Sequence, residues 1–83
     1  MDKPPFTNCS ANQICSALGR LGEFQCLRGG KHTIKVKHSF FARPFPLPDH
    51  GAVNSNIVKN LVNNILIRKL GIPAEKVYKE LWC

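Results

Sequence analysis

Acidic residues are scarce in this 83-residue chain and absent from its middle. Five Asp and Glu stand against twelve Lys and Arg, for a formal net charge of +7. No acid occurs from residue 24 to residue 48, a stretch whose basic residues are Arg28, Lys31, Lys35, Lys37 and Arg43. Charge of one sign attracts phosphate backbones through counterion release. The pattern favours a nucleic acid or an acidic protein as partner, although small domains can be basic with neither.

Long hydrophobic runs and a secretory signal are also missing. The longest apolar runs, such as residues 65–67, hold three residues, whereas a membrane-spanning helix needs about 18. The first residues lack the apolar stretch of a signal peptide. We therefore expect a cytoplasmic protein with no membrane partner. A chain of 83 residues buries about 60–65% of its unfolded surface, which is enough for one core and excludes a large cofactor enzyme.

The four cysteines form neither a CxxC pair nor a set with histidines at metal-ligand spacing. Without a secretory signal, disulfides are not expected. Cys15 falls in a helical pattern and Cys26 in a strand pattern, where a free cysteine behaves as a small hydrophobe. We predict buried thiols at Cys9, Cys15, Cys26 and Cys83, and no metal or cofactor. A Cys–His nucleophilic pair is an alternative that no local signature supports.

Two segments can be distinguished along the chain. Residues 1–9 contain two adjacent prolines and no periodicity, which predicts a loose leader, and residues 10–83 form a single domain. Ser10 and Gln13 have the spacing of a capping box. Apolar residues recur at helical spacing after it, and Gly22 stands where a helix-ending glycine is typical. We predict a first helix over residues 11–21.

After Gly22 the period changes to two, which predicts strands over residues 24–27, 33–38 and 42–47. Gly29 and Gly30 form the turn between the first two strands. In the second strand Ile34 and Val36 share one face, with lysines on the other. Three prolines make the third strand an edge strand or an irregular one; they are Pro44, Pro46 and Pro48.

A broad apolar stripe predicts a second helix over residues 54–70, capped by Asn54 or Ser55 and ended by Gly71. Pro73 fits the first turn of a short third helix, whose inward-facing residues are Val77, Leu81 and Trp82. The resulting fold is α+β, in the order α-β-β-β-α with a short C-terminal helix and a three-stranded antiparallel sheet. That order, with a basic open sheet face, is typical of double-stranded-RNA-binding domains.

Four short motifs in order resemble the HicA toxins, the mRNA interferases of bacterial toxin–antitoxin pairs. They are LGRLGEF at 18–24, GKH at 30–32, FPLPDH at 45–50 and ILIRKLGI at 65–72. The resemblance covers nearly the whole chain. It implies an endoribonuclease that cleaves mRNA, a HicB-like antitoxin as partner, and His32 as the residue required for cleavage. Family members often carry Ser before this histidine and a second His after it, where this chain has Lys31 and Thr33.

The residues themselves are compatible with that chemistry. RNA supplies its own nucleophile, the 2′-hydroxyl, so a histidine that moves protons near neutral pH can support cleavage without a metal. His32 is the candidate general base or acid. Lys31 and the amides of Gly29 and Gly30 are positioned by sequence to hold a phosphate. The residues expected to follow the RNA backbone are Arg28, Lys35 and Lys37.

Other interpretations are open at each position. His32 can be a hydrogen-bonded turn residue, while His38 and His50 are expected to be structural. Phe40, Phe41 and Phe45 can stack on bases, although aromatics beside a small sheet are more often core. Two rival functions follow: a non-catalytic RNA-binding module of the same fold, and an interaction protein whose basic face binds only an acidic protein.

Overall fold

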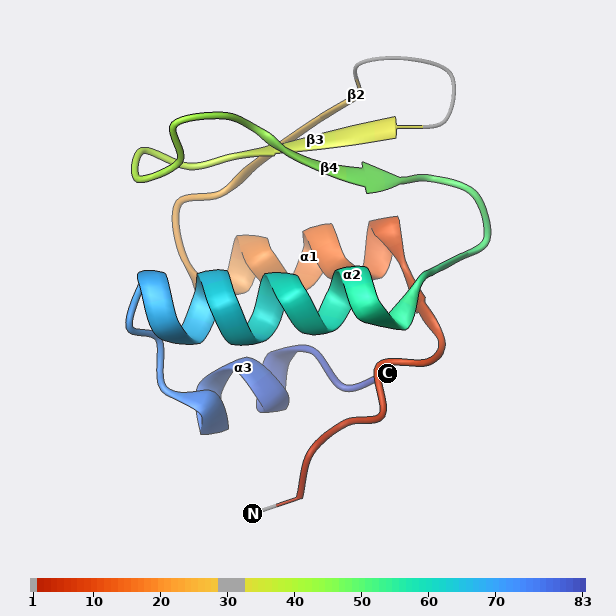
Figure 1. The fold of residues 1–83 in the computed structure, drawn as a ribbon, viewed down its shortest axis with the longest axis vertical. Coiled ribbons are helices and arrows are strands. Elements are labelled where there is room, and N and C mark those ends of the chain that lie inside the picture. Colours follow the sequence, from red (N-terminus) through yellow and green to blue (C-terminus); the bar gives the residue numbers. More distant parts are fainter. Residues whose placement is uncertain (1, 29–32) are drawn as a thin grey trace.

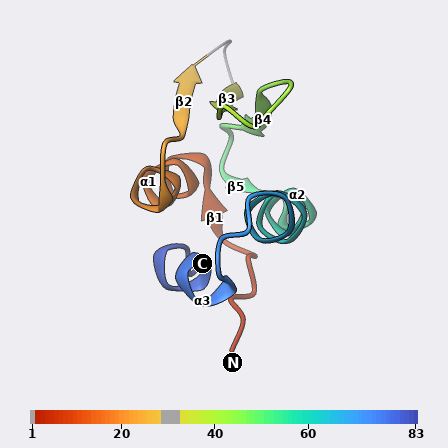
Figure 2. The same ribbon diagram turned by 90° about the vertical axis from the view of Figure 1, so that its left-hand side faces the viewer.

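Two helices lie against one face of a three-stranded antiparallel sheet, and a third helix lies beyond them, in the computed structural model (Figure 1). The structure describes residues 2–28 and 33–83. The sheet contains β2 (Gln25–Arg28), β3 (Thr33–Lys37) and β4 (Phe45–Pro48) in that order. Seen from the side, sheet, helix pair and third helix form successive layers (Figure 2). The α+β class and the antiparallel sheet are as the sequence predicts.

Helix α1 (Ala11–Leu21) has the bounds that the sequence predicts. Ser10 Oγ accepts a hydrogen bond from the Gln13 N–H at 3.1 Å, which satisfies a donor that the first helical turn leaves without a partner. The apolar residues at helical spacing form the buried stripe, which consists of Ala11, Ile14, Ala17, Leu18 and Leu21. At the other end, the Gly22 N–H donates to the Leu18 carbonyl.

The sheet buries one face and exposes the other. Ile34 and Val36 of β3 are buried together with Leu47 of β4, while Lys35 and Lys37 are exposed. Strand β4 is an edge strand, one of the two alternatives that its prolines predict, because a proline has no N–H to donate to a ladder. It begins three residues later than the predicted strand over 42–47, since the chain first turns after β3. In that turn the Phe41 N–H donates to the His38 carbonyl.

The second helix begins as α2 (Ser55–Asn60) and continues directly into a π-helical segment, η1 (Leu61–Lys69). Asn54 caps it by accepting a hydrogen bond from the Asn56 N–H at 2.8 Å. The wider winding appears at its end, where the Leu70 N–H donates to the carbonyl of Ile65. Gly71 follows at a φ of 71°, a left-handed conformation that favours glycine.

The third helix, α3 (Ala74–Glu80), begins after Pro73. Val77 and Leu81 are buried as predicted. Trp82 is 54% exposed, so its predicted inward orientation is wrong. The apolar residue that α3 buries beside Val77 is Tyr78, whose ring centroid lies 6.3 Å from that of Phe6.

The N-terminal residues differ from the predicted loose leader, because Phe6 and Cys9 are 3% and 0% exposed and belong to the core. Strand β1 (Cys9–Ser10) pairs with β5 (Ala52–Val53), a two-residue pairing too short to give a periodic sequence pattern. Within the part of the chain that the structure describes, no helix is both long and apolar enough to cross a membrane.

The prediction of free thiols is wrong, since the structure contains two disulfides. Cys9 is bonded to Cys83, and their Cα atoms are 5.2 Å apart. Cys15 of α1 is bonded to Cys26 of β2, with a Cα separation of 6.2 Å. Burial is as expected only for Cys9, and the other three cysteines are partly buried. The physical reason is tertiary: the fold brings each pair within disulfide reach, although the sequence spacing does not suggest it.

Candidate nucleic-acid interface

The outer face of the sheet is open and basic. Strand register places Gln25 opposite Lys37 and Leu27 opposite Lys35. Both lysines are exposed, and Leu27 is 45% exposed. The alternating residues on this face of the three strands include no acid. We call this surface the open face; its residues are Gln25, Leu27, Thr33, Lys35, Lys37, Pro46 and Pro48.

The open face combines two properties that suit a nucleic-acid backbone. Its two lysines are two residues apart on one strand, so their ammonium groups extend from the same side of the sheet. Its remaining side chains carry no charge to oppose a phosphate. Lys35 and Lys37 thus lie where the sequence predicts them, on the face opposite Ile34 and Val36.

An ion pair lies at the end of the sheet where β2 stops. Arg28 Nη1 donates to Asp49 Oδ2, and the two side chains are 66% and 25% exposed. At this exposure the pair is screened by solvent and contributes little to stability. Arg28 therefore reaches a phosphate only in competition with Asp49. The other predicted residues at this end, Gly29, Gly30, Lys31 and His32, lie outside the described residues.

An aromatic cluster occupies the opposite end of the sheet. It consists of Phe24, which precedes β2, and of His38, Phe40 and Phe41, which follow β3. The centroids of Phe24 and His38 are 4.6 Å apart, with the ring planes tilted by 44°. The His38 ring centroid lies 5.4 Å from the ring centroids of both Phe40 and Phe41. His38 is thus the central ring of the cluster.

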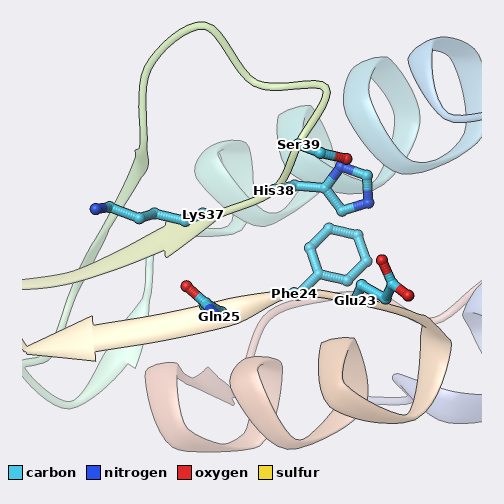
Figure 3. Close-up of a pocket in the computed structure, with 6 residues that line it drawn as sticks. All are labelled: Glu23, Phe24, Gln25, Lys37, His38 and Ser39. Atoms are coloured by element: carbon cyan, nitrogen blue, oxygen red, sulfur yellow. The ribbon is translucent and has the colours of Figure 1, made fainter.

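A backbone contact fixes the His38 ring. Its Nδ1 accepts a hydrogen bond from the Phe40 N–H at 3.1 Å, which holds the ring against the turn. Figure 3 shows the imidazole above the Phe24 ring, with the Glu23 carboxylate beside them and Lys37 directed away from the rings. These residues border a hollow of about 540 Å³, lined by Glu23, Phe24, Gln25, Lys37, His38 and Ser39.

The three phenylalanines after β3 differ in burial. Phe41 and Phe45 are half-buried and pack against the core, as the core interpretation predicts, whereas Phe40 is 67% exposed. Lys69 of η1 places its Nζ 5.9 Å from the Phe41 ring centroid, within cation–π range. The sequence predicts His38 as a structural residue at the end of the strand over 33–38, with no link to Phe24. The signal that could have found the cluster is the strand register, because continuing the Gln25–Lys37 pairing by one step brings Phe24 opposite His38.

His50 lies in the loop between β4 and β5, as the sequence predicts, and its side chain is exposed. Among the residues that the structure describes, no three His, Cys, Asp or Glu side chains are grouped so that they could hold a metal ion. No protein-family model, no curated protein and no solved structure matches this chain.

Proposed function

We propose that this chain is a metal-independent endoribonuclease of the HicA toxin type, built on a double-stranded-RNA-binding-domain-like fold, that cleaves mRNA and so blocks translation. The observation that carries the proposal is the open face. Lys35 and Lys37 are exposed there without an acidic neighbour on the same face, which suits an RNA backbone. The four HicA-like motifs add the cleavage step to RNA binding.

The proposed reaction uses the RNA's own 2′-hydroxyl. His32 accepts its proton, the 2′-oxygen bonds to phosphorus, and the bond to the 5′-oxygen breaks. The departing oxygen takes up a proton, which leaves a 2′,3′-cyclic phosphate and a 5′-hydroxyl end. Lys31 and the turn amides stabilise the charge that develops on the phosphate. One histidine contributes roughly 10²–10⁴-fold, so the enzyme is expected to be slow.

The proposal includes a HicB-like antitoxin that covers the open face and His32. Acidic groups on such a partner compete for the lysines that RNA uses, and opposite charges speed association. It also places the protein in the cytoplasm, where mRNA lies and thiols are kept reduced. The two disulfides are typical of an oxidising compartment. The proposal therefore requires that the protein cleave RNA in its reduced form as well.

The test is cleavage of a long unstructured RNA in the presence of EDTA, with and without a thiol reductant. We expect wild-type protein to cut under both conditions and His32→Ala to lose at least roughly 10²-fold in rate. His50→Ala is the matched control, since His50 lies in the β4–β5 loop and has no part in the proposed chemistry. Mass spectrometry of the products should find 2′,3′-cyclic phosphate ends.

Three other outcomes would each contradict one part of the proposal. RNA that is bound at low salt but left intact by wild-type protein contradicts the nuclease and leaves the non-catalytic RNA-binding module. Cleavage that survives His32→Ala contradicts the assigned residue. Absence of binding at low salt contradicts an RNA function altogether and favours the interaction protein.

A further inference from the structure

The aromatic cluster has features that core packing does not require. Phe41 packs against the core, but Phe40 is 67% exposed beside His38. Burying a phenylalanine is favourable relative to leaving it exposed. Phe40 therefore contributes little to folding where it stands, and its ring is available to a ligand.

The geometry around Phe40 is suited to a flat ring. The imidazole of His38 is held by its bond to the Phe40 N–H and is tilted by 49° to the Phe40 ring. The two rings are thus neighbours on one short segment, with Phe40 exposed and His38 partly buried. A hollow of about 540 Å³, lined by His38 but not by Phe40, lies next to them and is large enough for a neighbouring nucleobase. The Glu23 carboxylate at its border can accept hydrogen bonds from a base's amino or imino groups.

Cations surround the cluster. Lys37 leads from the hollow onto the open face. On the other side, Arg43 and Lys69 line a second hollow of about 280 Å³ together with Phe41. Aromatic rings interleaved with cations are the combination that binds single-stranded nucleic acid, because bases stack on the rings while phosphates contact the cations. Base-paired strands do not offer their base faces in this way.

We propose that the aromatic cluster is a base-stacking subsite for single-stranded RNA. One base stacks on the exposed ring of Phe40, with the tilted His38 ring beside its edge, and the flanking phosphates contact Lys37 and Arg43. The subsite rests on the proposed function only in taking RNA as its ligand, and it makes no use of His32. It lies at the end of β3 opposite Thr33, so an RNA strand bound there runs across the open face toward Thr33.

The test measures binding without cleavage. The probe is a labelled single-stranded DNA of about ten nucleotides, which lacks the 2′-hydroxyl, and its counterpart of equal length with abasic sites. Fluorescence anisotropy gives the affinity of each at several salt concentrations. Phe40→Ala is compared with Trp82→Ala, which removes an exposed aromatic side chain just after α3 and outside the aromatic cluster. Phe40→Leu keeps an apolar side chain but removes the aromatic ring.

Wild-type protein should prefer the base-bearing strand to the abasic strand. Phe40→Ala and Phe40→Leu should each lower affinity for it by roughly 5- to 150-fold. They should abolish the preference and leave the salt dependence unchanged, because the phosphate contacts remain. Trp82→Ala should bind like wild type. Thermal unfolding of every variant confirms that the fold is kept.

Equal wild-type affinity for the two probes, or unchanged affinity in Phe40→Ala, overturns the subsite. Failure of the nuclease looks different, since a protein that stacks bases but cuts no RNA keeps the subsite and loses the enzyme. Wild-type protein that binds neither probe at low salt but binds polyglutamate overturns the subsite in favour of an acidic protein partner.

Discussion

Single lysines on the open face should account for a measurable share of RNA affinity. Lys35 lies at the centre of that face, between Leu27 of β2 and Pro46 of β4. Each cation that neutralises a phosphate of a single strand contributes about 0.7 to the slope of log affinity against log salt. The strength of this contact therefore falls as salt rises.

We predict that Lys35→Gln weakens RNA binding a few-fold at low salt and reduces the salt slope by about 0.7. The measurement is anisotropy over a salt series. Lys76→Gln, which removes an exposed lysine from α3 on the far side of the molecule, is the matched control. Equal slopes for the two variants would show that the positive charge acts diffusely and that the open face is no specific contact.

Strand parity correctly predicted the face of the sheet on which Lys35 and Lys37 lie, because alternation along a strand depends only on local geometry. The exposure of Trp82 and Phe40 could not be predicted in this way. Both aromatic residues follow the last residue of a strand or helix, where neighbours from other elements determine whether a side chain is buried. The cap contact between Ser10 and Gln13 is local again, and the sequence predicted it.

Capping contacts determine where the helices begin. The second helix begins where Asn54 accepts a hydrogen bond from the Asn56 N–H. It then supplies four of the core's fully buried side chains, which are Val58, Leu61, Val62 and Leu66. Loss of the cap weakens the start of the helix that carries these buried side chains.

We predict that Asn54→Ala lowers the free energy of unfolding by about 0.5–2 kcal/mol. Asn54→Asp should keep wild-type stability, since its carboxylate also accepts from the helix and favours the positive end of the dipole. Urea denaturation followed by circular dichroism gives both values. An equal loss in both variants would mean that the amide nitrogen, and not the cap, matters at this position.

The sequence predicted the helices within a residue or two at most ends, because apolar spacing and glycine positions mark them. It did not predict the π-helical winding of η1, which depends on how a helix adapts to its neighbours. It also missed β1 and β5, whose two-residue strands carry no period. The edge position of β4 followed directly from Pro46, since that residue has no N–H.

In the molecule as a whole, the two disulfides restrain different parts of the chain. Cys9–Cys83 spans 74 residues and joins both ends of the chain, whereas Cys15–Cys26 spans 11 residues and fixes α1 to β2. Cross-linking restricts the unfolded chain, and the effect grows with the span. Pairing of this kind depends on the finished fold, which is why cysteine spacing alone pointed to free thiols.

We predict that replacing Cys9 and Cys83 by alanine lowers the free energy of unfolding by about 4 kcal/mol, and replacing Cys15 and Cys26 by about 3 kcal/mol. The measurement is urea denaturation without reductant. Reductant should also lower the free energy of unfolding of the wild-type protein. In each double variant, reductant should remove only the stability that its one remaining disulfide contributes. Wild-type stability that does not respond to reductant contradicts the observed pairing.

The sheet and the N-terminus lie at opposite ends of the long axis of the molecule, and the C-terminus also lies on the helix side (Figure 1). A protein fused to either terminus therefore emerges behind the open face and leaves it accessible. A tethered inhibitor meets the reverse situation, because a linker from the N-terminus must pass along a molecule 37 Å long. That path takes about 11 extended residues at roughly 3.3–3.6 Å each. An inhibitor on a shorter linker should leave RNA binding intact. Only a longer linker allows self-inhibition within one polypeptide.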